Sequence, residues 1–133
     1  MTPRNLLPSL MAAVLLADLT GGVIDVAAGR STWSSAWGPE ATLCAPLPMI
    51  ALQVLATIVA VRGRGWVARV AAPLLAAACL ASVASGFFDG QLARADLSPA
   101  EIGFQIVLLT LTALLGVVAG VLAAAPARRP VRS

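Results

Sequence analysis

Long apolar runs, separated by short polar stretches, make up most of this chain. Four such runs occupy approximately residues 6–28, 43–61, 70–88 and 101–125. Each is close to the ~20 residues that an α-helix needs to cross a hydrocarbon core of ~30 Å. None alternates apolar and polar residues with the period of two that a transmembrane strand would show. The pattern therefore predicts an all-α, four-helix transmembrane bundle.

The connections between these runs are short, so we expect consecutive helices to be antiparallel neighbours. Residues 1–133 then form a single transmembrane domain, in which residues 126–133 are a short basic tail. The last helix has a recognisable start. Ser98, Pro99 and Glu101 follow the capping-box pattern, in which side chains bind the first free N–H groups of a helix.

The arginines predict the orientation. One set of alternate connections and termini has no acidic residue and contains Arg4, Arg62, Arg64, Arg69, Arg128, Arg129 and Arg132. The other set contains Arg30 and Arg94 beside Asp25, Glu40, Asp89, Asp96 and Glu101. Because positively charged loops stay on the cytoplasmic side, both termini and the basic tail are expected there. We therefore expect a multi-pass protein of the cell membrane, in a bacterium the plasma membrane.

Composition excludes several classes of function. Of the 133 residues, 59% are hydrophobic and 11% are charged, whereas soluble domains carry about 25% charged residues. The chain has no histidine, which is the commonest general base, metal ligand and haem ligand. We therefore predict no enzyme, no cofactor and no metal site. The arginines flank apolar runs, so their expected partner is the lipid bilayer and not nucleic acid.

The first apolar run has a second interpretation, as a signal peptide cleaved near Ala28. Asp18 interrupts the run, and the run is long enough to span a membrane. We therefore expect this segment to remain as the first helix.

A polar stripe runs along the first predicted helix. Asp18 lies near its middle, where a carboxylate costs at least ~2.5–3.5 kcal/mol on insertion scales. Gly22 and Asp25 follow four and seven residues later and share its face. Gln53 is expected at a similar depth in the second helix, and Gln105 nearer the outer surface. Asp18, Asp25, Gln53 and Gln105 are thus a candidate intramembrane polar site.

Two interpretations of this site remain open. In one, a protonated Asp18 forms a hydrogen bond with Gln53 and joins two helices, a contact worth only ~0.6–2 kcal/mol. In the other, Asp18 is a protonatable or cation-binding group in a site that opens outward. The site therefore has a structural and a transport interpretation.

Small residues at four-residue spacing mark candidate packing stripes. The first helix carries Ala13, Ala17 and Gly21, and the fourth carries Gly116 and Gly120 as a GxxxG motif. Such stripes let helix backbones approach closely. They are consistent with packing within the bundle, with self-association, or with the chance spacing of an alanine-rich chain.

Cys44 and Cys79 are the two cysteines of the chain. Their expected depths differ by more than about 10 Å, which exceeds the ~7 Å Cα separation that a disulfide tolerates. We therefore predict two buried, unreactive thiols.

The second loop is basic and aromatic. It contains Arg62, Arg64, Arg69 and Trp66. Such a segment attracts anionic lipid headgroups, at ~1 kcal/mol for each arginine. Its charges are also explained by topology alone.

Our leading hypothesis for the function is a small, non-catalytic membrane protein that acts as an accessory or stabilising subunit of a membrane complex. Its partner would be another membrane protein or a second copy of the chain. No phosphate-binding loop, histidine or reactive cysteine setting favours catalysis, and almost no extramembrane domain is present.

The alternative is a small proton- or cation-coupled transporter. Residues 16–21 form a segment similar to the first-helix motif of the small multidrug resistance transporters, with Asp18 where they carry glutamate. Phe87 and Phe88, followed by a polar loop and the last helix, also resemble that family. The resemblance implies proton coupling at Asp18. Because the chain has no tyrosine and its third helix lacks the family's tryptophan-glycine pattern, this remains the alternative.

Overall fold

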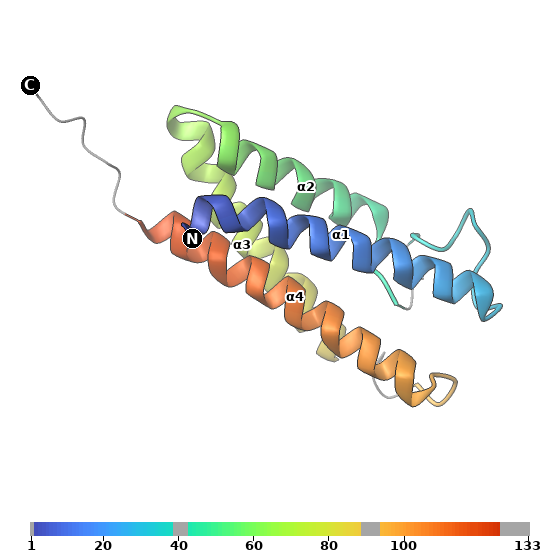
Figure 1. Ribbon diagram of the computed structural model, residues 1–133. Helices are drawn as coiled ribbons and strands as arrows, with labels where there is room; N and C mark the ends of the chain where they lie inside the picture. Colours follow the sequence, from blue (N-terminus) through green and yellow to red (C-terminus); the bar gives the residue numbers. More distant parts are fainter. Residues whose placement is uncertain (1, 39–42, 89–93, 126–133) are drawn as a thin grey trace, which may run out of the picture.

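The protein is described here by a computed structural model, which covers residues 2–38, 43–88 and 94–125. These residues form α1 (Pro3–Ala27), α2 (Leu47–Arg62), α3 (Gly65–Phe88) and α4 (Pro99–Ala124). The helices run up and down beside one another, and α1 and α3 each contact both α2 and α4 (Figure 1). The predicted all-α, four-helix architecture is confirmed.

The helices differ in length. With 25, 24 and 26 residues, α1, α3 and α4 are long and apolar enough to cross a membrane. In contrast, α2 has 16 residues, which correspond to about 24 Å at ~1.5 Å per residue. Of the four helices, only α2 is therefore shorter than its predicted range of residues 43–61.

Two helix starts differ from their expected positions by four residues or more, whereas α1 and α4 begin three and two residues earlier than predicted. We predicted that the second helix begins at residue 43, but α2 begins at Leu47, because proline at position 46 and side-chain contacts hold the preceding residues in a non-helical conformation. The third helix was expected from residue 70, but α3 begins at Gly65. Gly65 adopts a positive φ of 67°, which allows the chain to reverse within two residues. Trp66 and Arg69 therefore lie on α3 and not in a loop.

The capping box at the start of α4 is confirmed. The Ser98 hydroxyl accepts a hydrogen bond from the Glu101 N–H at 3.2 Å, and the Ser98 N–H donates to Glu101 Oε2 at 2.7 Å. These bonds fix the position of the Glu101 carboxylate at the helix start.

The two ends of the bundle differ in character. The start of α1, the α2–α3 connection and the end of α4 lie together at one end (Figure 1). We call it the arginine end, after Arg4, Arg62, Arg64 and Arg69. There Arg4 Nε donates to the Val61 carbonyl oxygen at 2.9 Å and so satisfies a terminal carbonyl of α2. The opposite end, with the α1–α2 and α3–α4 connections, is the loop end.

An apolar core fills the half of the bundle nearer the arginine end. It contains Leu7, Met11, Val14, Ala56, Ala60, Ala71, Ala72, Leu75, Cys79, Leu115 and Ala119. Toward the loop end, buried polar side chains replace these apolar ones. The candidate functional site lies in that second half.

Candidate functional site: a polar cluster at the loop end

The α1–α2 connection folds back onto the bundle at the loop end. Ala36 and Leu43 are fully buried, and Cys44 is 9% exposed. We call residues 43–46, which lead into α2, the returning segment. It is non-helical, so its backbone N–H groups need hydrogen-bond partners from elsewhere in the protein.

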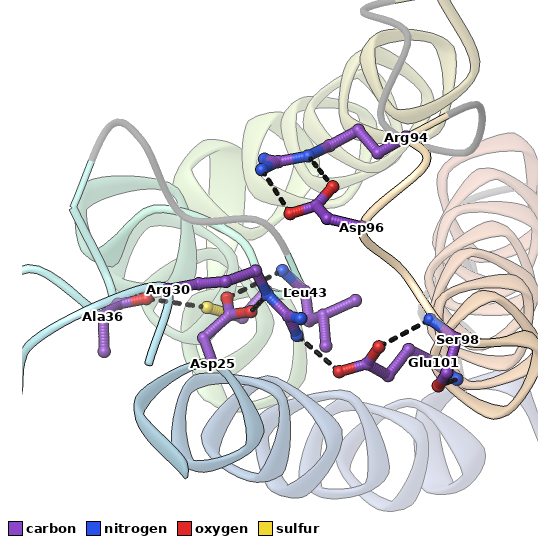
Figure 2. A network of polar contacts seen from close by, with 9 residues as sticks. Asp25, Arg30, Ala36, Leu43, Arg94, Asp96, Ser98 and Glu101 are labelled. Atoms are coloured by element: carbon purple, nitrogen blue, oxygen red, sulfur yellow. Dashed lines mark hydrogen bonds and ion pairs between the residues drawn. The ribbon is translucent and has the colours of Figure 1, made fainter. Parts of the chain in front are cut away.

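Asp25 and Arg30 join α1 to α4. Asp25 is fully buried, and its Oδ1 accepts a hydrogen bond from Arg30 Nε at 3.0 Å. The same guanidinium group contacts Glu101 Oε1 at 2.5 Å. Figure 2 shows Arg30 between the two carboxylates, with Glu101 also held by Ser98. One arginine thus joins both acids, and its single positive charge offsets one of their two negative charges.

The two aspartates of α1 bind the returning segment. Asp25 Oδ2 accepts from the Leu43 N–H at 3.1 Å, and Asp18 Oδ1 accepts from the Ala45 N–H at 2.8 Å. Hydrogen bonds to carboxylates are stronger than those between neutral groups. Asp18 and Asp25 therefore replace the helical hydrogen bonds that these two residues lack.

Two adjacent glycines of α1 make room for the connection. A Cβ atom at Gly21 would collide with the Leu43 carbonyl, and one at Gly22 would collide with the ring of Trp37. The Trp37 Nε1–H also donates to the Asp18 carbonyl oxygen at 3.1 Å. The absence of side chains at both positions lets the connection lie directly against the α1 backbone.

The four candidate polar residues are all buried, but they do not form the predicted pair. Asp18 and Gln53 are each 1% exposed, Asp25 is 0% and Gln105 is 5%. Gln53 Nε2 contacts Ser82 Oγ of α3 at 3.4 Å, whereas Asp18 bonds to Ala45. The prediction of a hydrogen bond between Asp18 and Gln53 is therefore wrong. The first helix binds a loop backbone in its place.

Two buried oxygens of this region make no hydrogen bond within the described part of the chain. They are Asp18 Oδ2 and Gln53 Oε1. A buried polar atom without a partner costs ~1–3 kcal/mol. Each is therefore a place where a water molecule or a cation would be stabilising, and Asp18 Oδ2 can also take a proton.

The small-residue stripes have separate roles. Gly116 packs against α3, since a Cβ there would lie 2.9 Å from Cys79 Cβ, whereas a Cβ at Gly120 would meet no atom within 4 Å. A Cβ at Gly21 would collide with the returning segment first and would also lie 3.2 Å from the Phe104 ring of α4. Ala13 and Ala17 are half-buried on α1. Of these glycines, only Gly116 would bring a Cβ atom within 3.0 Å of another helix.

The prediction that both cysteines are buried and unpaired by a disulfide is confirmed for Cys44 and Cys79. The Cys44 thiol donates to the Ala36 carbonyl oxygen at 3.2 Å. This bond links the returning segment to the earlier part of the same connection.

A second ion pair at the loop end is exposed. Arg94 and Asp96 are joined at 2.8 Å, with side chains 38% and 48% exposed (Figure 2). The hydrogen bond from Arg94 lowers the pKa of the Asp96 carboxyl. Because the pair is open to solvent, we expect it to add little to stability.

Sequence reasoning missed the contacts of the connection with α1 and the bridge from Arg30 to Glu101. A signal existed in the paired Gly21 and Gly22, which leave a gap in the side-chain surface of α1 at the depth of the acids. The part of the chain that the structure describes contains no group of three or more histidine, cysteine, aspartate or glutamate side chains that could hold a metal ion.

No model of a known protein family, no curated protein and no solved structure matches this chain. The proposed function therefore rests on the polar cluster and on the outer surfaces of the helices.

Proposed function

We propose that this chain is an integral membrane protein that crosses the bilayer four times, with both termini on the cytoplasmic side. The distribution of side chains supports it. Large apolar residues point outward on every helix, including Leu16 (65% exposed), Leu55 (61%), Leu80 (60%) and Val117 (58%). At the same time the interior holds polar side chains. Such a surface is stable in lipid and not in water.

The short α2 is compatible with a fourth crossing. A span of ~30 Å requires about 20 helical residues, and α2 provides 16. The returning segment adds four residues at the loop end. Irregular backbone is tolerated at membrane depth only where protein groups bind its polar atoms. Asp18 and Asp25 provide that binding.

The proposed orientation follows the charges. Arg4, Arg62, Arg64 and Arg69 lie at the arginine end, which would face the cytoplasm. The described acidic residues occupy the loop half of the bundle. The cluster of Figure 2 would then lie near the outer surface.

Within the membrane, we propose a non-catalytic role as an accessory or stabilising subunit of a membrane complex. The observation that carries this proposal is the use of the polar stripe of α1. Its carboxylates hold the returning segment, and Trp37 covers Gly22 between them. The stripe is therefore used for structure and is not left as an open path for a substrate.

A proton- or cation-coupled transporter is the second candidate. It is favoured by one observation, the buried Asp18 Oδ2 that has no hydrogen-bond partner among the described residues. A carboxyl oxygen in that state is a suitable acceptor for a transported proton.

One comparison of variants separates the two candidates. Asp18→Asn keeps an oxygen that accepts from the Ala45 N–H but cannot exchange a proton, whereas Asp18→Ala removes the acceptor. Each variant and the parent would be reconstituted in liposomes, and both thermal stability and pH-driven flux would be measured. The accessory role predicts no flux in the parent and a loss of stability of ~1–3 kcal/mol in Asp18→Ala only.

Flux in the parent that disappears in a stably folded Asp18→Asn protein would establish the transporter and reject the accessory role. The subunit role has its own test in native membranes. Cross-linking followed by purification is expected to recover a membrane-protein partner, and recovery of a lone monomer would contradict it.

A further inference from the structure

An apolar groove lies on the outer surface between α2 and α3. It has a volume of about 240 Å³ and is lined by Leu55 and Val59 of α2 and by Trp66, Val70 and Leu74 of α3, among others. The three α3 residues recur every fourth position and so share one helix face. No polar side chain contributes to the lining. The groove can therefore hold a hydrocarbon chain.

Positive charge lies at one end of this groove. Arg62 follows Leu55 and Val59 by seven and three residues, on the same side of α2. Arg64 lies in the connection between the helices, and Arg69 is one turn beyond Trp66. An apolar surface that suits a fatty acyl chain thus adjoins a positively charged surface that suits an anion.

These arginines are exposed, and no ion pair within the described residues compensates their charges. Among the described residues, the ion pairs involve Arg30 and Arg94 and none of the three arginines beside the groove. The acidic side chains of the described ranges lie toward the loop end. An anion from outside the chain would therefore find three unpaired guanidinium groups, the side chains that favour phosphate.

We infer that the groove between α2 and α3 is a binding site for one anionic phospholipid. One acyl chain lies along Leu55, Val59 and Val70, and the phosphate lies among Arg62, Arg64 and Arg69. Trp66, which is 74% exposed, lines the groove in the first turn of α3. A partner helix would fill the apolar groove equally well, but a helix without acidic residues would leave the arginines unpaired. This inference rests on the proposed membrane location.

The test uses Trp66 as the reporter in vesicles of symmetric composition, so that the orientation of the inserted protein does not matter. The Trp66 signal is the fluorescence of the parent minus that of Trp66→Phe. Brominated phosphatidylglycerol and brominated phosphatidylcholine are compared as quenchers. We expect phosphatidylglycerol to quench at a concentration lower by about tenfold or more, because each arginine near an anionic headgroup adds to binding.

Matched variants assign the effect to the site. Arg62→Gln/Arg64→Gln/Arg69→Gln is expected to abolish the preference. The control is the same change in the tail, at Arg128, Arg129 and Arg132, which should retain it. Helical circular dichroism verifies that each variant is folded.

A second pair of variants tests the groove itself. Val70→Phe fills the groove and is expected to weaken quenching, whereas Val117→Phe, at an exposed position on α4, is expected to leave it unchanged. Equal quenching by the two lipids in the parent would overturn the proposal. So would a preference that survives the triple substitution beside the groove.

Two further results would also overturn it, for different reasons. If Val70→Phe leaves the preference intact, the arginines attract an anionic surface and no lipid occupies the groove. If a photo-cross-linker at position 70 captures a protein and not a lipid in native membranes, the groove is a protein interface. Failure of every variant to float with vesicles would reject the membrane location itself.

Discussion

Replacement of Asp25 by alanine should release the returning segment from the bundle. The change leaves the fully buried Leu43 N–H without an acceptor, which costs ~1–3 kcal/mol. It also removes a charged hydrogen bond from Arg30, worth ~1.5–3 kcal/mol, although Arg30 retains Glu101. The expected total is about 3–5 kcal/mol, the range for breaking one partner of a buried ion pair.

Cys44 reports this opening directly. It belongs to the returning segment, is 9% exposed and donates to Ala36, so a thiol reagent reaches it only when the segment detaches. In a Cys79→Ala background, Cys44 is the single thiol. A loss of about 3 kcal/mol or more in local stability should accelerate labelling by about 100-fold.

Asp96→Asn is the matched control, because it removes an acid of the same loop end from an exposed ion pair. We expect its labelling rate to stay within about fivefold of the parent, as surface pairs contribute ~0–1 kcal/mol. If Asp25→Ala labels no faster than Asp96→Asn while both remain helical, the returning segment is not held by Asp25 and our reasoning is refuted.

Four further substitutions test single contacts, Gly22→Ala by tryptophan fluorescence and the others by thermal unfolding in detergent. Gly116→Ala should destabilise the protein by ~1–3 kcal/mol, because its Cβ meets α3 at 2.9 Å, whereas Gly120→Ala should be neutral or stabilising by up to ~1 kcal/mol; equal effects would contradict this packing. Gly22→Ala should displace Trp37 and shift its emission, and an unchanged spectrum would argue against their contact. Ser98→Ala should cost ~1 kcal/mol through the lost helix cap, and a neutral result would mean that water replaces the hydroxyl.

The helices were predictable because their signals are local. The apolar runs predicted four helices in the correct order, and the sequence from Ser98 to Glu101 predicted a cap that the structure contains. The burial of Cys79 also followed from its place within an apolar run. Each of these features depends on neighbours within a few positions of the chain.

The site was less predictable because its contacts are made to backbone atoms. Asp18 was expected to bind another polar side chain, and Gln53 was the available choice at that depth. Its partner is the N–H of Ala45, a group that nearly every residue carries and that no sequence pattern marks. For the same reason the start of α2 was placed four residues too early. Residues 43–46 are apolar enough for a helix, but Pro46 and tertiary contacts keep them non-helical.

A single structural requirement connects these features of the loop end. On the proposed membrane location, α2 is too short to span the hydrocarbon alone, so non-helical residues must complete the crossing. Their N–H groups would each cost several kcal/mol if left unbound in lipid. Asp18 and Asp25 provide acceptors from α1.

The buried charge of Asp25 then requires a cation nearby, because an isolated carboxylate would be far more costly than the hydrogen bond it makes. Arg30 provides that charge, and it also binds Glu101 at the capped start of α4. The acids of α1 therefore need no transported ion to explain their presence. Arg30 and the Leu43 N–H account for both oxygens of Asp25. For Asp18, the Ala45 N–H accounts for one oxygen, and the second has no hydrogen-bond partner within the described residues. For this reason the comparison of Asp18→Asn with Asp18→Ala is the experiment that decides between the two proposed roles.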